Sequence, residues 1–492
     1  MIHPLQTLDD MTNGVTMYKG VLWGVLSLLA IAELSAVLDV IGINPLGLIV
    51  SVVILAVSCY GANYVFARLF RAAPNSESWL ITALILACIL NPKTSWSFVL
   101  LAALCGAIAM ASKYVITWRG SHIFNPAAFG AFVVSTAGLL SANWWIATPA
   151  LLPVTAGLAF MVLRKQRRFT MFFTFMAAVL VTMLLVNIGQ GREVAEVAKD
   201  AFLSWPLVFL GSVMLAEPVT LPADTYAQLL VAVVVGVLFG SQLEFGSFSV
   251  APHTALLVGN MIAAVIAVPF GTWLVLRRLS HPAPDIIELV FTKPKGMAFR
   301  AGQYMEWTLP HTGADIRGNR RTFTIASAPA EDTVRLAVRT FEKSSSYKTA
   351  LARLKPGNRL RAANISGQFT LPSTNEKLLF IAGGIGITPF RSMIVQLQAT
   401  KRQHDIVLVY LASDERHFLY KDLFAEAAAQ GLKTHYLLTQ VAAEELQQLV
   451  PDAQERLVYI SGPNGMVRHY DALLRGLGVA RGRIRKDHFS GY

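Results

Sequence analysis

The first half of the chain is too apolar for a soluble protein. Ten apolar runs lie between Gly20 and about Leu276, at residues 20–41, 45–70, 79–91, 95–116, 122–141, 144–163, 169–189, 203–217, 225–243 and 254–276. Several reach the roughly 20 residues that a helix needs to cross a bilayer. The whole chain is 54% hydrophobic with a mean hydropathy of +0.50. We therefore expect a polytopic α-helical membrane domain of about ten passes.

Two of these runs, 79–91 and 203–217, are short, and each ends in a polar residue followed by proline. The pairs are Asn91-Pro92 and Glu217-Pro218. A helix that stops inside a membrane leaves backbone groups that must face protein or a ligand. The pattern predicts two broken helices.

The two breaks belong to an internal repeat. Pro92 and Pro218 are 126 residues apart, as are Pro126 and Pro252. The same offset pairs Ser78 with Ser204, Trp79 with Trp205, Thr94 with Thr220 and Gly120-Ser121 with Gly246-Ser247. Each copy would hold five passes. Since five is odd, the second copy must enter the membrane from the opposite side, which gives an inverted repeat.

Basic residues gather in alternate loops. They are Arg68, Arg71, Lys113, Arg119, Arg164, Lys165, Arg167, Arg168, Arg277 and Arg278. The positive-inside rule then places both termini, and everything after residue 280, in the cytoplasm. It also accounts for the net charge of +12 without a nucleic-acid partner. The three cysteines have no metal-ligand spacing, so no metal site is expected.

Four polar residues flank the paired prolines: Asn91, Glu217, Asn125 and His253. Inverted-repeat proteins bind ligands where broken helices meet, and a carboxylate within a membrane points to function. These residues are therefore candidates for an intramembrane site. Helix capping is the alternative for the two asparagines.

The stretches "RGSHIFNPAAFGAF" (119–132) and "VMLAEPVTLPADTYAQLL" (213–230) resemble a known family over residues 20–276. The family comprises the flavin-carrying B and D membrane subunits of the Na⁺-translocating NADH:quinone reductase and Rnf complexes. The resemblance implies a protein of the bacterial inner membrane, with FMN or riboflavin near Phe124, Asn125, Glu217 and Thr220. The family has Asp-Pro at Glu217-Pro218, and its Ser-Gly-Ala-Thr attachment site is missing here, so any such flavin would be non-covalent.

Residues from Asp285 onward read as soluble. Short alternating runs such as "RTFTIAS" and "VRLAVRTF" predict an antiparallel β-barrel, after a linker at Pro282 and Pro284. After about residue 374, fully apolar strands such as "KLLFIAG" and "DIVLVYLAS" alternate with helical stretches and predict a parallel α/β domain.

The stretch "IAGGIGITPF" predicts a strand that ends in a glycine turn, followed by a helix. We expect Thr388 to cap this helix and Pro389 to occupy its first position. Free N–H groups at such a helix start suit a pyrophosphate. A purely structural turn is the alternative.

Five further motifs accompany the turn in order: "AGQY" (301–304), "RTFTIAS" (321–327), "SGQFTLP" (366–372), "YISGPNGM" (459–466) and "DHFSGY" (487–492). Together they resemble the ferredoxin–NADP⁺ reductase superfamily, which implies an NAD(P)H-dependent flavin oxidoreductase with FAD. The residues that the resemblance assigns to FAD are Arg321, Phe323, Thr324, Ser345, Ser346 and Lys348. Those that it assigns to the dinucleotide are Gly383, Gly384, Gly386, Thr388, Ser461, Gly462, Pro463 and Met466. Asp487, Phe489 and Tyr492 would close the flavin site; the alternative for Tyr492 is a frayed terminus. Thr324, Ser461, Asp487 and Tyr492 would lie closest to hydride transfer.

The loop "ASDERHF" after the strand that ends near Tyr410 bears on the choice of dinucleotide. Asp414 and Glu415 would repel a 2′-phosphate, although Arg416 is nearby. This favours NADH over NADPH.

The expected organisation is a cytoplasmic N-terminus (1–19), a membrane domain (20–278), a FAD-binding barrel (281–373) and an NAD(P)-binding α/β domain (374–492). Such a chain would take a hydride from NAD(P)H and pass electrons to a membrane flavin, a quinone or an exported flavoprotein, in contact with membrane lipid.

Three alternatives are a haem-based reductase using His122 and His253, a transporter that senses nucleotide redox state, and an ion pump using Glu33, Asp39 and Glu217.

Overall fold

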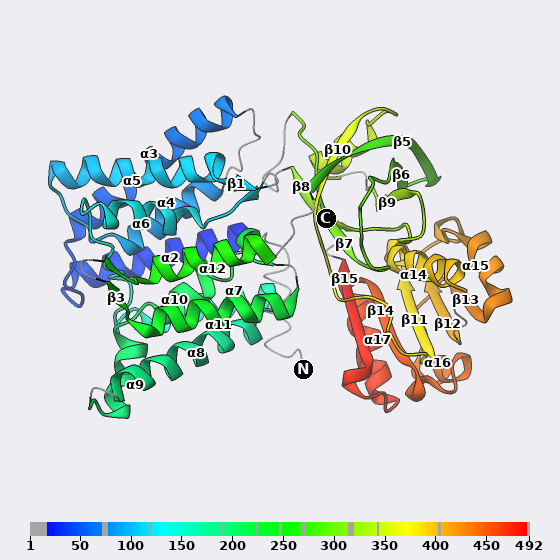
Figure 1. Ribbon diagram of the computed structural model, residues 1–492. Helices are drawn as coiled ribbons and strands as arrows, with labels where there is room; N and C mark the ends of the chain where they lie inside the picture. The colour runs from blue at the N-terminus through cyan, green and yellow to red at the C-terminus, as the bar shows by residue number, and fades with distance from the viewer. Residues whose placement is uncertain are drawn as a thin grey trace. The chain divides into compact units, whose positions relative to one another are not determined.

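The computed structural model describes residues 17–70, 77–118, 121–188, 191–222, 224–245, 248–266, 271–312, 319–341, 344–401 and 405–489. The chain divides into two compact units, Met1–Pro269 and Phe270–Tyr492. Figure 1 shows helices in the first unit and two sheets with short helices in the second.

The first unit contains the helices α2 (Met17–Val37), α3 (Pro45–Leu69), α4 (Ser78–Ile89), α5 (Trp96–Val115), α6 (Pro126–Thr136), α7 (Leu152–Gln166), α8 (Phe169–Ile188), α9 (Val194–Leu203), α10 (Leu207–Phe209), α11 (Thr225–Ser241) and α12 (Pro252–Ile266). A π-helical turn, η1 (Leu210–Met214), continues α10, and a 3₁₀ turn, η2 (Pro218–Thr220), follows the break. Two short hairpins join helices: β1 (Thr117–Trp118) with β2 (Ser121–His122), and β3 (Glu244–Phe245) with β4 (Phe248–Ser249).

Each of the ten predicted runs contains a helix, but the count of ten passes is not confirmed. Within the described residues, α2, α3, α5 and α8 are long and apolar enough to cross a membrane. The segments Val194–Leu203 and Leu207–Met214 meet at 59° and would make a fifth span if taken as one. The remaining apolar helices have 11 to 17 residues.

The last predicted run ends too late. Helix α12 stops at Ile266, whereas β5 (Gly271–Ala283) already belongs to a sheet of the second unit. The expected boundary at residue 278 and the linker at Pro282 are therefore wrong. The stretch "GTWLVL" is apolar because Leu274 and Leu276 point into the β-sheet core, where both are buried.

The order of elements repeats along the first unit. Helices α6 and α12 begin at Pro126 and Pro252, and each follows one of the two short hairpins. Helix α3 packs on α5 as α8 packs on α11. The Asn125 N–H donates to Asn260 Oδ1 at 2.9 Å, while Ser135 Oγ lies 3.1 Å from His253 Nε2. The start of α6 thus contacts the later part of α12 and the end of α6 contacts its start, so these repeat-related helices are antiparallel.

The second unit begins with a six-stranded antiparallel sheet in the order β8-β7-β10-β5-β6-β9. After β5, its strands are β6 (Ile286–Thr292), β7 (Tyr304–Thr308), β8 (Arg320–Thr324), β9 (Thr333–Arg339) and β10 (Arg359–Ser366). Alternate residues such as Leu289, Trp307 and Leu336 are fully buried. One backbone hydrogen bond, from Ala326 N–H to the Arg335 carbonyl at 3.0 Å, joins the segment after β8 to β9. Closure into the expected barrel stays a prediction.

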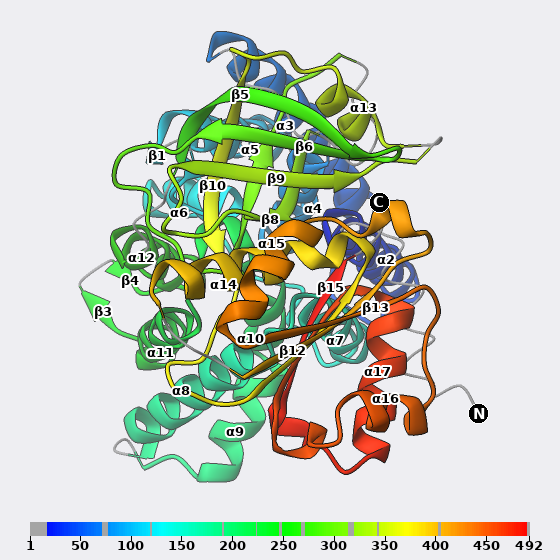
Figure 2. The same ribbon diagram turned by 90° about the vertical axis from the view of Figure 1, so that its right-hand side faces the viewer.

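A five-stranded parallel sheet follows, in the order β13-β12-β11-β14-β15. Its strands are β11 (Leu378–Gly383), β12 (Ile406–Leu411), β13 (Leu432–Leu437), β14 (Leu457–Pro463) and β15 (Ile484–Phe489), and the unit's helices are α13 (Ser346–Ala352), α14 (Thr388–Ala399), α15 (Lys421–Ala427), α16 (Ala443–Leu449) and α17 (Asn464–Gly476). Successive β11 residues alternate between two apolar cores: Phe380 packs with α14 and α15, and Ile381 packs with α16 and α17. Figure 2 shows these helices beside the strands of the parallel sheet. Burial on both faces is why these strands are continuously apolar.

Candidate functional site

The flavin-side motifs converge on one edge of the antiparallel sheet. Tyr304 pairs with Thr324, and the Ile325 N–H donates to the Gln303 carbonyl at 2.9 Å. Gln303 Nε2 in turn donates to the Gly367 carbonyl at 3.2 Å. The motifs "AGQY", "RTFTIAS" and "SGQFTLP", far apart in sequence, are therefore adjacent in the fold.

Tyr347 connects the residues assigned to FAD in β8 with those at the start of α13. The Arg321 guanidinium lies over the Tyr347 ring at 5.2 Å, and the Phe323 ring centre is 6.1 Å from it. The Tyr347 hydroxyl donates to the Trp307 carbonyl at 3.1 Å, and its burial raises the pKa of this tyrosine above its usual range. Tyr347 was missed by the sequence analysis, although it lies between Ser346 and Lys348.

Side chains at the start of α13 complete this group. Ser345 caps the helix by accepting from the Lys348 N–H at 3.3 Å, and Ser346 Oγ lies 3.0 Å from His311 Nε2. The Lys348 ammonium sits 5.5 Å from the Phe341 ring centre. Hydroxyls and cations of this kind suit the phosphates of a dinucleotide.

The glycine turn faces β14. A Cβ on Gly383 would lie 2.3 Å from Met466 Sδ, and one on Gly386 would lie 2.3 Å from the Ser461 carbonyl oxygen. Close packing therefore requires both glycines. Gly384 differs: it has φ +53°, and a Cβ there would meet only Arg339 Nη1, at 3.9 Å. The backbone at Gly384 is the part of the turn that a ligand can approach.

Thr388 does not cap α14, so that expectation is wrong. Residues Gly384–Ile387 form a 3₁₀ turn that runs directly into the helix, and Ile387 occupies the cap position without a side-chain hydrogen bond. Thr388 is 2% exposed and donates to the Ile385 carbonyl at 3.1 Å. Pro389, expected at the first position, is the second residue of the helix.

The nicotinamide-side residues meet at the ends of three strands. Ala382 pairs with Ser461, which pairs with Asp487, and Pro463 pairs with Phe489. Ser461 is fully buried, and its hydroxyl has no partner within the described part of the chain. The Phe489 side chain and Tyr492 lie outside the described residues.

The polar residues of the first unit form two clusters. Asn125 Nδ2 donates to Glu217 Oε2 at 2.8 Å, and His122 Nε2 lies 3.8 Å from Glu217 Oε1. Asn125 Oδ1 also accepts from the Ala128 N–H at 3.1 Å, so its capping role is confirmed alongside this contact. Thr220 is buried beside Glu217, with Oγ1 at 3.5 Å from the Glu217 carbonyl.

The remaining membrane candidates lie elsewhere. His253 contacts Ser135, and its ring is parallel to Trp144 at 6.4 Å. Phe124 stacks on Phe129 at 5.6 Å. Within the described segments, no group of three or more His, Cys, Asp or Glu residues has the placement of a metal site. Asn260 was missed, because its contact with Asn125 depends on helix packing and leaves no local pattern.

The second unit contains a segment that matches a known family. The pattern described as "Oxidoreductase NAD-binding domain" matches residues 380–472. The chain is 32% identical over 248 residues to "Ferredoxin--NADP reductase B" of Sorangium cellulosum, covering 45% of this chain and 98% of that protein. The chain belongs to the ferredoxin–NADP reductase family.

More distant relatives show the same partial overlap. The chain is 27% identical over 227 residues to "Stachydrine N-demethylase reductase subunit Stc4" of Rhizobium meliloti, covering 42% of this chain and 64% of that one. A Neisseria gonorrhoeae ferredoxin NADP+ reductase structure with bound FAD and NADP aligns at 18% identity and a TM-score of 0.40, covering 45% of this chain and 99% of that chain. The chain thus spans less than two thirds of the length of the Rhizobium meliloti relative.

The second unit is an NAD(P)H-dependent flavin oxidoreductase domain that uses FAD. Its residues fit these cofactors. Arg321 and His311 lie beside the Tyr347 ring, and Lys348 lies over the Phe341 ring. The open backbone at Gly384 lies beside the Arg339 guanidinium.

Proposed function

We propose that the protein is a membrane-bound flavin oxidoreductase that takes electrons from cytosolic NAD(P)H and passes them into or across the membrane. The observation that carries the proposal is one chain with a reductase unit of the ferredoxin–NADP reductase family and a unit with four helices of membrane-spanning length. FAD supplies the chemistry that converts a two-electron hydride into single electrons.

In the reductase unit, one set of residues would bind FAD and another would bind the nicotinamide dinucleotide. Arg321, Ser345, Ser346 and Lys348 would hold the FAD phosphates, with Phe323 and Thr324 beside the ring. The backbone at Gly384, next to Arg339, would receive the dinucleotide. Ser461, buried and without a partner among the described atoms, would orient the nicotinamide.

NADH is the proposed donor. In the loop after β12, the Arg416 guanidinium is bound to Asp414 through Nε at 3.0 Å and Nη2 at 2.7 Å. Its charge is thereby matched by the adjacent carboxylate, and a 2′-phosphate would approach that carboxylate at close range. The ribose hydroxyls of NADH carry no such charge.

The acceptor side would lie in the first unit, and a flavin held without a covalent bond near Phe124, Asn125, Glu217 and Thr220 is the proposed intermediate carrier. The cluster in which Asn125 bonds Glu217 supports this, because a carboxylate at a helix break is a costly feature in a membrane protein. A quinone or an exported flavoprotein would be the final acceptor. The proposed boundary near residue 374 lies between β10 and β11, where the antiparallel sheet is followed by the parallel one, whereas the proposed start at 281 falls within β5.

The test uses the purified full-length chain in detergent. Acid precipitation would separate bound from covalent flavin, and extracted FAD and FMN or riboflavin would be counted per chain. We expect one FAD, a second non-covalent flavin, and NADH-dependent reduction of a water-soluble quinone. FAD alone with no quinone reduction would contradict the membrane relay, and a colourless protein after incubation with FAD would contradict the whole proposal.

A further inference from the structure

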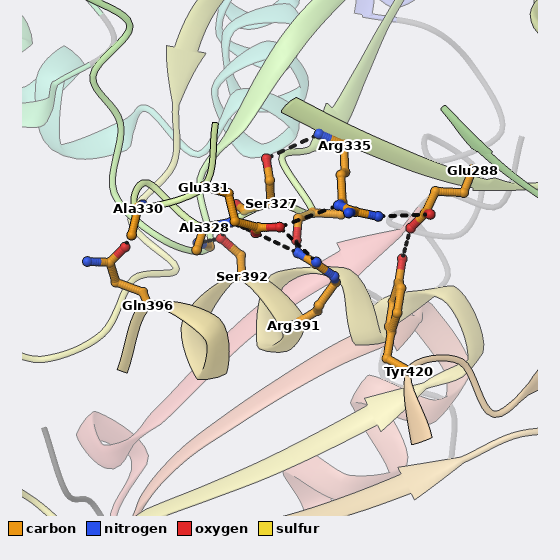
Figure 3. Close-up of polar contacts among 12 residues, drawn as sticks. Glu288, Ser327, Ala328, Ala330, Glu331, Arg335, Arg391, Ser392, Gln396 and Tyr420 are labelled. Atoms are coloured by element: carbon orange, nitrogen blue, oxygen red, sulfur yellow. Dashed lines mark hydrogen bonds and ion pairs between the residues drawn. The ribbon is translucent and has the colours of Figure 1, made fainter. Parts of the chain in front are cut away.

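An ion pair between a buried arginine and a partly buried glutamate connects the helix that follows the glycine turn to the segment that follows the flavin-side motif. Arg391 lies in α14, three residues after Thr388, and is 5% exposed. Its Nη1 donates to Glu331 Oε2 at 2.8 Å and its Nη2 to Glu331 Oε1 at 2.9 Å (Figure 3). Two parallel bonds of this kind fix orientation as well as distance.

The same turn of α14 also binds the flavin-side motif directly. Arg391 Nη1 donates to the Ala326 carbonyl at 2.8 Å, and Ser392 Oγ donates to the Ser327 carbonyl at 2.6 Å. Ala326 and Ser327 end the "RTFTIAS" segment, whose Arg321 and Phe323 lie at the proposed FAD site. The first part of α14, which follows the glycine turn, therefore also binds the flavin-side segment through Arg391 and Ser392.

Further polar contacts orient the Glu331 carboxylate and its neighbour Arg335. The Ala328 N–H donates to Glu331 Oε2 at 2.5 Å, and Arg335 Nε lies 3.4 Å from Glu331 Oε1. Arg335 Nη1 donates to Glu288 Oε2 at 3.2 Å, and the Tyr420 hydroxyl donates to Glu288 Oε1 at 2.8 Å (Figure 3). Tyr420, from the loop after β12, lies under the Arg391 guanidinium at 5.3 Å.

Such a network is poorly explained by stability alone. Removing charges from water is expensive, and an apolar cluster of equal volume stabilises a fold as well or better. What apolar packing lacks is direction. The bidentate pair and its backbone bonds leave α14 a single orientation relative to residues 326–328, whereas leucine or methionine contacts would allow sliding.

We propose that Arg391 and Glu331 are positioning residues that set the distance and angle between the nicotinamide and the flavin ring. The inference rests on the proposed function of the reductase unit. Neither side chain touches the reacting atoms; both act by fixing α14 against the flavin segment. Because a displacement of about 1 Å at the reacting centre slows a reaction by roughly 100-fold, a small loss of alignment has a large effect on rate.

The test uses the full-length protein in detergent with FAD bound. The variants are Arg391→Met, which keeps the length of the side chain, Glu331→Gln, and Arg391→Lys. The control is Lys377→Met, because Lys377 pairs with Asp452 at 3.1 Å and Glu455 at 2.8 Å on the exposed surface just before β11. Anaerobic stopped-flow mixing with NADH gives the rate of flavin reduction and the NADH Kd.

We expect Arg391→Met and Glu331→Gln to slow flavin reduction by about 10- to 100-fold, with FAD content unchanged and the NADH Kd within about threefold of wild type. Arg391→Lys should retain part of the rate, and Lys377→Met should match wild type. The long-wavelength charge-transfer absorbance of the reduced enzyme with NAD⁺ should weaken in parallel. Rates within twofold of wild type, or losses that follow FAD content alone, would overturn the proposal.

Hydrogen–deuterium exchange of the same proteins without nucleotide separates this inference from the proposed function. If Arg391 and Glu331 fix α14 against the flavin segment, replacing either residue should speed exchange in residues 326–328 and 388–399 together. If NADH fails to bleach even the wild-type flavin, the proposed function is wrong. The exchange data alone then decide whether Arg391 and Glu331 fix α14 against the flavin segment. Unchanged exchange in both segments would then reject it.

Discussion

His417 Nε2 lies 2.6 Å from Asp285 Oδ1, so the loop after β12 is bound to the turn between β5 and β6. The second oxygen, Asp285 Oδ2, accepts from Arg339 Nε at 2.6 Å. Arg339 reaches the open backbone at Gly384, while His417 follows the loop proposed to meet the adenosine ribose. One carboxylate thus orders two residues on either side of the proposed dinucleotide site.

Replacing this carboxylate should weaken dinucleotide binding. Asp285→Asn removes the charge that orients Arg339 and His417, and a hydrogen bond to a charged group contributes about 1.5–3 kcal/mol. We expect the NADH Kd to rise by roughly tenfold or more, since ~1.4 kcal/mol is a factor of ten. Fluorescence titration of the full-length protein would measure it. Asp422→Asn, on the exposed start of α15, is the control; equal affinities in both variants would contradict the prediction.

Acid should loosen the reductase unit through the same carboxylates. Burial raises the pKa of Glu331, but hydrogen bonds and charge from Arg391, with help from the Ala328 N–H and Arg335, bring it below its usual value. Burial acts against the Asp285 pKa as well, and Arg339 and His417 again lower it overall. A depressed pKa contributes stability above the unfolded-state value near 4 and loses it as pH falls through the folded-state value.

We therefore expect the melting temperature of the reductase unit to be flat near neutral pH and to fall below about pH 4. Glu331→Gln should reduce this acid sensitivity while lowering the melting temperature at pH 7. Differential scanning fluorimetry from pH 3 to 8 would show both effects. A melting temperature of Glu331→Gln that follows wild type across the whole range would argue against them.

Freeing Arg416 should alter dinucleotide preference. Asp414→Asn removes the carboxylate that binds the Arg416 guanidinium, and the arginine can then meet a 2′-phosphate. We expect kcat/KM for NADPH to rise by about tenfold, worth ~1.4 kcal/mol, with little change for NADH. Glu426→Gln, on the exposed face of α15, is the matched control. An unchanged NADPH/NADH ratio would show that the loop does not contact the ribose.

The Glu217 carboxylate, proposed to lie within the membrane, should matter only for the proposed membrane acceptor. Glu217→Gln keeps the shape of the side chain but removes the charge that meets Asn125 and His122. We expect NADH:quinone activity to fall by at least about tenfold, or ~1.4 kcal/mol in the barrier, while NADH:ferricyanide activity stays at the wild-type level. Glu244→Gln, at an exposed position in β3, should change neither. Equal loss of both activities would instead indicate a folding defect.

Two glycines of the reductase unit should respond oppositely to alanine. A Cβ on Gly386 would lie 2.3 Å from the Ser461 carbonyl oxygen, a backbone atom that cannot move aside cheaply. We expect Gly386→Ala to destabilise the unit by about 1–3 kcal/mol or to prevent folding. Gly465, in α17, has no neighbour within 4 Å, so Gly465→Ala should be neutral or stabilising by up to ~1 kcal/mol. Chemical denaturation of the two variants would measure the difference.

The fold was predictable where one local pattern decided it. Strand β11 reads as buried on both faces because both of its faces pack under helices. Gly383 and Gly386 signal the turn because Met466 of α17 and the Ser461 backbone of β14 leave no room for side chains. The strand β5 was misread because an apolar run of this length suits a helix or a core strand, and only partner strands decide. The cap at Thr388 was misread because a 3₁₀ turn before the helix takes its hydroxyl.

The candidate site was predictable only in part. Motif residues such as Arg321 and Gly384 carry sequence signals. The structure places Arg321 over the ring of Tyr347 and Gly384 near Arg339, and the cofactor roles of both residues stay predictions. Arg391, Glu331 and Asn260 carry none, because an arginine in a helix, a glutamate in a turn and an asparagine in an apolar helix acquire meaning only from partners distant in sequence.

The broken helix before Glu217 depends on a charge from elsewhere in the chain. Arg168 Nη1 donates to the Ala216 carbonyl at 2.6 Å. This carbonyl lies at the end of the helix, where the helix supplies no backbone N–H to it. Arg168 also belongs to the basic loop that the positive-inside rule counts. Replacing Arg168 would therefore remove this partner of the Ala216 carbonyl and, at the same time, one of the basic charges on which the predicted orientation depends.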